Sequence, residues 1–501
     1  MKILAQYEVE SDEVPADVEI AQKDGEYINT YELRHVELEK PTSSVLDLLK
    51  EKIIEDVDIR LSEILEPREA ENVRSKLVDK AKQIIKRELP GLSENYEKIL
   101  VGRLAQDMLG LGEIELLLAD ANLEEVVVNG ASGPVYVYHK KFGWLKTNVR
   151  IPSEDQIHNY ASTIGRKVGK QITNLTPLMD ARLLSGNRVN ATLFPISFKG
   201  NGITIRKFRE TPWTIVNFID PQVRSLSPEV AALIWQAVQY ELNVLVGGGT
   251  ASGKTSFLNS ILAFTPTNQR VISIEDTREL VLPDFLHWTP LVTREANPEG
   301  KGEVSMLDLM VNSLRMRPDR IVLGEIRRAR EAEVLFEAMH TGHSVYSTVH
   351  ADTAQQVKSR LTNPPIDLPE PEISAVHLVL VMYRQRRTGL RRLFEVSEFS
   401  ESEGGRVPLN SLYQYNPRSD ITEKVGESVR LFSELNLHTG FTNKEIIKDL
   451  NDKQAVLEWM QKQQVTNVND VGKIVASYYR DPEDVVAMSL KNKKADELLG
   501  R

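Results

Sequence analysis

Residues 243–256 carry the sequence Asn243-Val-Leu-Val-Gly-Gly-Gly-Thr-Ala-Ser-Gly-Lys-Thr-Ser256. Its apolar start predicts the end of a buried strand. The pattern G-x-x-x-x-G-K-[ST] follows on Gly248, Gly253, Lys254 and Thr255, and a helical apolar stripe comes next. A strand, a glycine-rich loop and a helix in this order are the setting in which the motif binds phosphate. Because both flanks fit, a chance match to a glycine-rich turn is disfavoured, and the stretch predicts a nucleoside triphosphate site.

The residue types of this loop suit phosphate chemistry. Glycines let backbone N–H groups point at phosphate oxygens without a Cβ in the way. Lys254 can reach the β- and γ-phosphates, and the hydroxyl of Thr255 can ligate Mg²⁺. The N-terminus of the following helix adds partial positive charge. The expected nucleotide-binding residues are Gly248, Gly249, Thr250, Ala251, Ser252, Gly253, Lys254, Thr255 and Ser256.

Length and composition set the frame for this site. The 501 residues, 27% of them charged, predict about three domains of a soluble globular protein. No apolar run reaches the ~18–20 residues of a membrane span, and the N-terminus lacks a signal-peptide pattern. With no cysteine, disulfides, thiolate metal sites and cysteine nucleophiles are excluded. We expect a cytoplasmic protein.

The net charge of −10 is unevenly distributed. Residues 1–72 hold 8 Lys/Arg and 20 Asp/Glu, so the rest of the chain is near neutral. An acidic start disfavours nucleic acid and anionic lipid, and it could dock a basic partner or simply be a solvated face. Residues 384–392 hold five arginines around a Thr-Gly turn. A solvated β-turn is favoured there over contact with nucleic acid or headgroups, since no aromatic residues are interleaved.

The periodicity of the chain suggests its organisation. Apolar residues at helical spacing cover 43–67 and 73–89 and continue from Glu94. Strand patterns then dominate to Phe208, and from Ser227-Pro228, an N-cap followed by proline, helices alternate with short apolar strands. Capping boxes are expected at Ser305 and Thr442. The expected parts are an acidic N-terminal region with helices (1–110), an α+β domain (111–208), a linker (209–224), an α/β nucleotide-binding domain (225–400) and a mainly helical C-terminal region (401–501).

Carboxylates follow two of the apolar strands after the loop. Glu275 and Asp276 end one strand, and Glu325 closes the next one after Gly324. A single carboxylate at a strand end commonly caps a turn. Two in this order favour a site, because hydrolysis of a γ-phosphate needs a carboxylate to orient water and another near Mg²⁺.

Two histidines flank a short strand further on. His343 follows Thr341-Gly342, and His350 lies seven residues later. The strand between them is expected to hold both near the nucleotide edge, as hydrogen-bond sensors of the phosphate. The alternative is that both histidines are ordinary packing or surface residues. A zinc site is disfavoured, because no Cys or carboxylate stands at ligand spacing from them.

Together these blocks resemble the secretion-ATPase superfamily, which drives type II and type IV secretion and the assembly of type IV pili and archaella. The matching blocks are its Walker A loop, its Asp box at Glu275-Asp276, an atypical Walker B at Gly324-Glu325 and its His box at His343…His350. Upstream, residues 180–190 and 203–208 are similar to its N-terminal domain. The resemblance covers roughly 110–400, and residues 134–148 favour the archaeal branch.

The resemblance implies a fold and roles for individual residues. The expected fold is α/β: a RecA-like P-loop NTPase domain, preceded by an α+β domain and an N-terminal helical region, and followed by a small helical tail. Glu275 would activate water, Glu325 would act on Mg²⁺ or water, and Lys254 would stabilise the γ-phosphate. Arginines expected to reach the phosphates are Arg206 (preferred, as a catalytic residue), Arg182 and Arg188, with Arg315, Arg317 and Arg327 as further candidates.

The resemblance also implies partners. We expect a homohexamer that uses ATP and Mg²⁺, lies peripherally at the cytoplasmic membrane, and pushes on a polytopic membrane platform protein that feeds pilin-like subunits into a filament. Zinc is not expected, since the four-cysteine module of some bacterial branches is impossible in a chain without cysteine. Nucleic acid is not expected either, because the N-terminal region is acidic and clusters of aromatic and basic residues are lacking. The rival hypothesis is a nucleic-acid translocase or helicase, because RecA-like sheets also build those motors. A kinase lacks any visible acceptor site.

Overall fold

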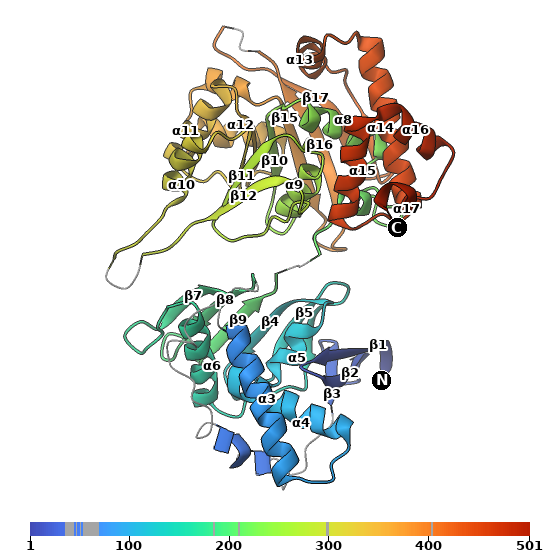
Figure 1. The fold of residues 1–501 in the computed structure, drawn as a ribbon. Coiled ribbons are helices and arrows are strands. Elements are labelled where there is room, and N and C mark those ends of the chain that lie inside the picture. Colours follow the sequence, from blue (N-terminus) through green and yellow to red (C-terminus); the bar gives the residue numbers. More distant parts are fainter. Residues whose placement is uncertain are drawn as a thin grey trace. The chain divides into compact units, whose positions relative to one another are not determined.

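The computed structural model describes residues 1–35, 45–46, 48–50, 52–53, 70–183, 186–208, 211–296, 300–401 and 404–500. Contacts within the chain divide it into two compact units, Met1–Phe208 and Arg209–Arg501 (Figure 1). Within the described ranges no helix is long and apolar enough to cross a membrane.

Unit 1 is built on one nine-stranded sheet with the order β1-β2-β3-β6-β5-β4-β9-β8-β7. Only β3 and β6 pair in parallel; every other neighbouring pair is antiparallel. The strands are β1 (Lys2–Ser11), β2 (Val14–Gln22), β3 (Thr30–His35), β4 (Leu123–Asn129), β5 (Tyr136–His139), β6 (Gly143–Thr147), β7 (Leu178–Arg182), β8 (Arg188–Thr192) and β9 (Gly202–Arg206).

Four described helices accompany this sheet: α3 (Ala70–Glu88), α4 (Glu94–Leu109), α5 (Ile114–Ala119) and α6 (Glu154–Lys167). The hydroxyl of Ser153 begins α6 by accepting the N–H of Gln156 at 3.1 Å. The first strands join the same sheet as β4–β9, so the sheet extends across position 110, where the sequence suggested a boundary. The helix expected over 43–67 lies largely outside the described residues.

Unit 2 contains a second nine-stranded sheet, ordered β12-β11-β13-β14-β10-β15-β16-β17-β18. From β12 to β15 the pairs are parallel, and β16 to β18 extend the sheet in antiparallel fashion. Its strands are β10 (Val244–Gly248), β11 (Arg270–Glu275), β12 (His287–Val292), β13 (Arg320–Leu323), β14 (Ser344–Val349), β15 (Leu378–Arg384), β16 (Arg391–Phe399), β17 (Leu409–Asn416) and β18 (Ile421–Lys424).

Helices cover both faces of the parallel part. Along β10, Val244 and Val246 belong to one core cluster and Leu245 to the other, as alternation along a strand requires. The first cluster includes α8 (Pro228–Gln239) and α9 (Lys254–Leu262); the second includes α10 (Met306–Ser313), α11 (Ala329–His340) and α12 (Ala354–Thr362). The predicted α/β fold with a mostly parallel, doubly covered sheet is confirmed.

Two stretches outside the parallel sheet differ from the sequence pattern. The short helix α7 (Ile215–Phe218) lies within the expected linker 209–224, and its apolar side chains are buried in the core of unit 2. Residues 401–501 contain β17 and β18 before the expected helices begin. Those helices are α13 (Arg430–Thr439), α14 (Asn443–Lys462), α15 (Val468–Arg480), α16 (Pro482–Leu490) and α17 (Asp496–Leu499). The predicted capping boxes at Ser305 and Thr442 are confirmed.

A buried ion pair fastens α14 to the helix that precedes the P-loop strand. Lys453 has no exposed surface and pairs with both carboxylate oxygens of Asp449. Asp449 also accepts hydrogen bonds from Tyr478 (2.9 Å) and from Gln236 of α8 (2.8 Å). The Lys453 ammonium lies 5.8 Å from the ring centre of Trp235, also on α8. Burial lowers the pKa of Lys453, and the pair with Asp449 opposes that shift.

Replacing Lys453 by methionine is expected to destabilise unit 2 by about 3 kcal/mol, because removing one partner leaves a partly buried carboxylate at Asp449 uncompensated. Urea unfolding followed by circular dichroism measures the change. The matched control is Lys448→Met on the same helix, whose side chain is 77% exposed and ion-paired with Asp452 only at 4.0 Å. The control should shift stability by no more than about 0.5 kcal/mol. Equal effects of the two substitutions would contradict a stabilising role for the buried pair.

Candidate active site

The P-loop joins β10 to α9 in the conformation that the sequence predicts. Gly253 has a left-handed φ of 94°, where glycine is favoured. A Cβ at Gly248 would lie 2.5 Å from the carbonyl oxygen of Met382, so no side chain fits. The Lys254 ammonium donates to the carbonyl oxygen of Gly249 at 3.0 Å. Burial lowers the pKa of Lys254. A bound triphosphate would supply the negative charge that favours its protonated form.

The parallel strands bring the other candidate residues to the same sheet edge. Because β10, β11, β13 and β14 run in parallel, their carboxyl ends share one edge. Glu275 ends β11, Glu325 follows β13 by one residue after Gly324, and His350 follows β14 directly. Ligands of open α/β sheets bind at this edge.

Glu275 is the most perturbed carboxyl group at this edge. It is 2% exposed, and its Oε1 accepts the backbone N–H groups of Glu279 (2.9 Å) and Leu280 (3.2 Å). The buried Oε2 has no hydrogen-bond partner within the described part of the chain. Burial raises the pKa of Glu275 to about 7. A carboxyl with this pKa and one unengaged oxygen suits a general base near neutral pH.

If Glu275 is the general base of a nucleotide hydrolase, the hydrolysis rate is expected to rise with pH through about 7, as the Glu275 carboxyl loses its proton. Its pKa is raised above the ordinary value of 4.5, so the group is mainly protonated at pH 6 and mainly ionised at pH 8. By the same linkage, its contribution to folding stability is present below about pH 4.5 and is lost as pH rises from there to about 7, since the folded state holds the proton longer. A kcat profile over this range measures the first effect. A parent profile without the rise, or a rise that persists in Glu275→Gln, would contradict it.

Asp276 and Glu325 share one arginine. The guanidinium of Arg327 donates to Oδ2 of Asp276 at 2.5 Å and to Oε2 of Glu325 at 2.8 and 3.0 Å. This arginine thus connects the ends of β11 and β13. The arrangement places Arg327, one of the six candidate arginines, beside the two acidic blocks of its own unit. Glu325 could reach Mg²⁺ only by sharing or leaving this ion pair.

The two histidines lie at opposite ends of β14. The Nε2 of His350 is 3.0 Å from the hydroxyl of Thr250 in the P-loop. His343 precedes the strand instead, with its Nδ1 3.2 Å from the carbonyl oxygen of Ala338 and 3.2 Å from the hydroxyl of Thr341. The prediction that both lie near the nucleotide edge is wrong for His343. A six-residue strand separates its ends by roughly 20 Å, so only His350 contacts the loop.

Two residues at the P-loop were missed by sequence reasoning. The Nε of Arg391 donates to the carbonyl oxygen of Ala251 at 3.1 Å. A Cβ at Gly249 would lie 2.7 Å from Oδ1 of Asp352, so this carboxylate contacts the loop backbone. Both could have been found from topology. Asp352 follows β14 as closely as His350 does, and β16 begins at the edge where β15 ends.

The candidate arginines of unit 1 form a row. Strand register pairs Arg182 of β7 with Arg188 of β8, and Arg188 with Arg206 of β9. Arg188 also forms an ion pair with Asp180 at 3.0 Å. The three arginine side chains therefore lie at the same end of three neighbouring strands.

Arg315 and Arg317 lie elsewhere in unit 2. They occur in and just after a 3₁₀ turn (Leu314–Met316) that precedes β13. The beginning of a parallel strand is at the sheet edge opposite to the P-loop. Within their own unit these two arginines are thus not brought to the loop.

The residues at the loop fit a nucleotide-held magnesium ion better than a protein-built metal site. Among the residues that the structure describes, no group of three or more His, Cys, Asp and Glu could hold a metal. Thr255 lies in the first turn of α9, directly after Lys254. Mg²⁺ commonly takes one or two protein ligands and completes its shell with phosphate oxygens and water. The hydroxyl of Thr255 and the carboxylate of Glu325 are the residues that would hold it, and the ion would neutralise charge on the phosphates.

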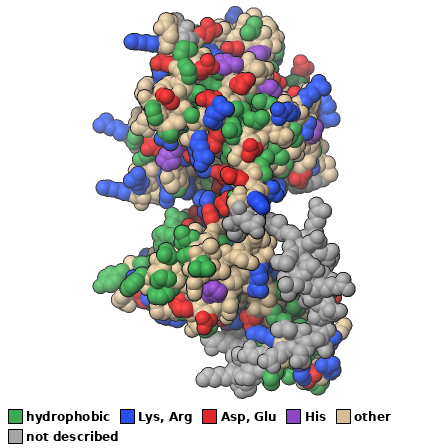
Figure 2. All heavy atoms as spheres, turned by 90° about the vertical axis from the view of Figure 1, so that its left-hand side faces the viewer, with side chains coloured by type: hydrophobic (Ala, Val, Ile, Leu, Met, Phe, Trp, Pro, Cys, Tyr) green, Lys and Arg blue, Asp and Glu red, His purple; other side chains and the backbone are tan. Residues whose placement is uncertain are grey.

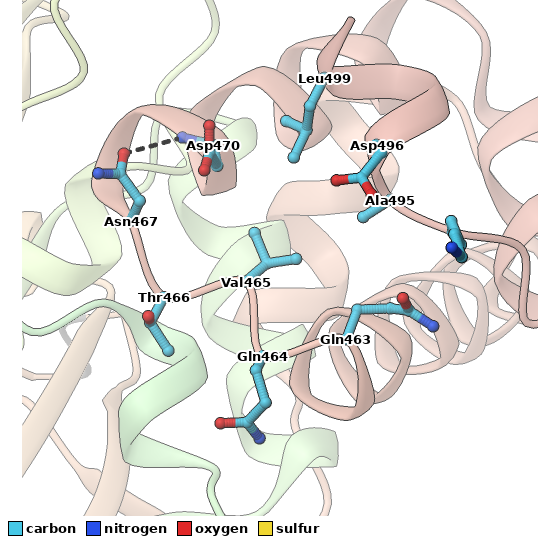
Figure 3. A pocket seen from close by; sticks show the side chains of 10 residues that line it. Gln463, Gln464, Val465, Thr466, Asn467, Asp470, Ala495, Asp496 and Leu499 are labelled. Atoms are coloured by element: carbon cyan, nitrogen blue, oxygen red, sulfur yellow. Dashed lines mark hydrogen bonds between the residues drawn. The ribbon is translucent and has the colours of Figure 1, made fainter. Parts of the chain in front are cut away.

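A cavity of about 380 Å³ lies away from the P-loop, among the C-terminal helices (Figure 3). Its lining includes Gln464, Asn467 and Asp496. The Asn467 side chain is used to cap α15, where it accepts the N–H of Asn469 at 2.9 Å. The lining also includes Lys494, but no glycine belongs to it, so it lacks the glycine-rich backbone of the loop.

A glycine-rich loop between a strand and a helix, with carboxylates on the neighbouring strand ends, gives this unit the α/β arrangement that the sequence predicts. The chain belongs to the type II/IV secretion system protein family, whose profile matches residues 107–388.

Named relatives come from archaea and bacteria. The uncharacterized protein MJ0900 of Methanocaldococcus jannaschii is 34% identical over 75% of this chain and 69% of its own length. The uncharacterized protein MJ0781 of the same organism is 43% identical, but the match spans 46% of this chain and only 32% of that protein. The type IV secretion system protein VirB11 of Bartonella quintana is 26% identical over 54% of this chain and 84% of its own.

The chain is also similar to two solved structures. The VirB11 ATPase of the Brucella suis type IV secretion system, in complex with sulphate, is 26% identical over 56% of this chain and 90% of its own, with a TM-score of 0.29. The pilus retraction motor PilT with bound ADP is 17% identical over 75% of this chain and 96% of its own, with a TM-score of 0.41.

Proposed function

We propose that this chain hydrolyses ATP with Mg²⁺ and spends the energy on secretion or on the assembly of a type IV pilus-like filament or archaellum. The observation that carries the proposal is Glu275, a buried carboxyl at the P-loop edge, one oxygen of which has no hydrogen-bond partner among the described residues. Burial also raises its pKa to about 7. Family membership supports the same chemistry. The nucleic-acid translocase hypothesis gains no support from the family or the relatives.

The proposed reaction uses residues of the loop after β10 and residues that end or follow β11, β13 and β14. Lys254 and the loop amides would bind the β- and γ-phosphates, and Thr255 and Glu325 would hold Mg²⁺, which neutralises phosphate charge when bound. Glu275 accepts a proton from the attacking water, so a hydroxyl attacks the γ-phosphorus while the bond to ADP breaks. His350 reports the state of the loop through its contact with Thr250.

The proposed motor is a homohexamer. The arginines of unit 1, Arg206 first among them, would reach the phosphates from their own chain or a neighbouring subunit. Hydrolysis would then alternately clamp and release unit 1 against unit 2 across the linker. That motion would act at the cytoplasmic membrane, on a polytopic platform protein that feeds pilin-like subunits into the filament. The domain limits predicted from the sequence, with an ATPase domain over 225–400, are part of this proposal.

Light scattering of the purified full chain tests the assembly. With Mg²⁺ and a non-hydrolysable ATP analogue, the particle mass should approach six times the chain mass of 56.6 kDa. The same preparation should release phosphate from ATP. A chain that stays monomeric with nucleotide and releases no phosphate would overturn the proposal. Filament loss on deletion of the gene in its host, restored by the parent but not by Glu275→Gln, would tie the activity to assembly.

A further inference from the structure

Unit 1 carries a group of exposed apolar side chains at one end of its β7–β8 hairpin. The exposed fractions are 95% for Leu175, 63% for Leu178, 56% for Phe194, 60% for Ile196 and 87% for Phe198. We call these five residues the apolar tip. Hydrophobic side chains are seen to protrude from the lower unit in Figure 2. Exposed apolar residues that gather in one place mark binding surfaces, whereas scattered ones do not.

The apolar tip is formed by two loops that lie side by side. One loop precedes β7 and the other follows β8, and these strands pair from Leu178 with Thr192. The N–H of Leu193 donates to the carbonyl oxygen of Pro177 at 2.8 Å, which joins the loops. Buried Ile172 anchors the first loop in the core of unit 1, and buried Leu193 anchors the second.

Hydrogen bonds hold both loops in shape. In the first, Thr173 and Thr176 exchange backbone hydrogen bonds at 3.2 and 3.0 Å. In the second, the N–H of Phe194 donates to the side chain of Asn201 at 2.8 Å, and the N–H of Ser197 donates to Leu193 at 3.1 Å. The backbone of both loops is therefore held by hydrogen bonds, and the five apolar side chains remain exposed on it.

The charge around the apolar tip is positive. Residues 166–178 and 193–200 hold four Lys/Arg and no Asp/Glu. Of these, Arg166, Lys167 and Lys199 are exposed. The carboxylate of Glu154 is engaged by the backbone N–H groups of Ala131 and Asn201, each at 2.6 Å. The carboxylate of Asp180, two residues after Leu178, is paired with Arg188 at 3.0 Å.

The acidic part of unit 1 lies at the other edge of the sheet. Residues 1–35 hold nine Asp/Glu and three Lys/Arg, and they form β1–β3, whereas β7 is the last strand at the opposite edge. The acidic residues of β1–β3 and the basic residues around the apolar tip therefore lie at opposite edges of the sheet. Apolar residues flanked by basic ones are suited to the interface of a bilayer that contains anionic lipid.

We propose that the apolar tip inserts into the surface of an anionic lipid bilayer, with Arg166 and Lys199 against the headgroups. The side chains would replace water by the acyl boundary, and the acidic edge of the sheet would stay away from the negative surface. The inference rests on the proposed function in one respect, which is that the proposed motor acts at a membrane. Binding itself needs neither ATP nor hydrolysis.

Co-sedimentation of the full chain with vesicles, without nucleotide, tests the proposal. Vesicles of phosphatidylcholine with about 30% phosphatidylglycerol should bind the parent protein, and pure phosphatidylcholine should bind it at least about tenfold less. Salt at about 1 M should weaken binding, because it screens exposed charges. Leu175→Ser with Phe198→Ser should reduce the bound fraction by about tenfold or more, since two large apolar groups are lost. Lys199→Glu should also reduce it.

Matched controls come from exposed leucines of unit 2. Leu437 is 78% exposed and Leu490 is 72% exposed, so the double variant Leu437→Ser with Leu490→Ser removes similar apolar surface and should bind as the parent does. Hydrolysis of ATP in solution should be unchanged in the tip variant, which separates this inference from the proposed function. Absence of binding by the parent, or equal binding by the tip variant, would overturn it. So would a tip variant that binds vesicles normally but loses self-association in light scattering, because that result assigns the surface to a second copy of the chain.

Discussion

Glu275→Gln should lower the rate of ATP hydrolysis by about 10²–10⁴-fold, the usual contribution of a general base. The amide is nearly isosteric, and its oxygen can still accept the N–H groups of Glu279 and Leu280. Glutamine cannot take a proton from water, so the chemical step is lost while the loop around it stays in place. Phosphate release under saturating ATP measures the rate, and binding of a fluorescent ATP analogue should change little.

The control for this substitution is Glu333→Gln on α11. Glu333 is half exposed and pairs with Arg330 on the helix surface, so its replacement should leave hydrolysis at the parent rate. If Glu275→Gln also retains the parent rate, the base is another carboxylate. Glu325→Gln would then be the next variant to measure, since Glu325 is another carboxylate placed at this edge by the parallel strands.

Lys254→Ala should weaken ATP binding by about 10–100-fold, because a charge-assisted hydrogen bond is worth about 1.5–3 kcal/mol. The hydrolysis rate should fall by a further factor of about 10²–10³, since positive charge at the γ-phosphate also stabilises the transition state. The apo protein should keep its stability nearly unchanged, because the partly buried ammonium gives up only its hydrogen bond to Gly249. Calorimetric titration with ATP measures the affinity.

A matched control for this lysine is Lys448→Ala, which removes an exposed ammonium on α14. It should bind and hydrolyse ATP as the parent does. If Lys254→Ala retains the parent affinity, the loop between β10 and α9 does not bind the triphosphate.

Much of unit 2 could be predicted because local signals and long-range topology agree there. The strand ends at Gly248 and Glu275 follow apolar runs too short for helices, and the caps at Ser227 and Ser305 mark helix starts directly. In a parallel sheet, the order of these elements is enough to bring their carboxyl ends to one edge. The strand β17 was missed because it belongs to the antiparallel end of the sheet, where few positions are buried and the alternation is weak.

The parts of the site that escaped prediction depend on which end of an element a residue occupies. His343 and His350 are close in sequence, yet a strand between them directs them to opposite edges. Arg391 is remote from the loop in sequence, and only the turn from β15 into β16 brings it back to Ala251. The pKa of Glu275 depends on burial by neighbouring strands, which no local pattern encodes.

Steady-state phosphate release by the purified full chain, with ATP and Mg²⁺ at pH 8, tests the central claim most directly. The proposed site predicts turnover by the parent that is lost in Lys254→Ala and in Glu275→Gln and retained in Glu333→Gln. Turnover at the parent level in both site variants, or no turnover by a folded, nucleotide-bound parent, would contradict a hydrolytic site at this loop.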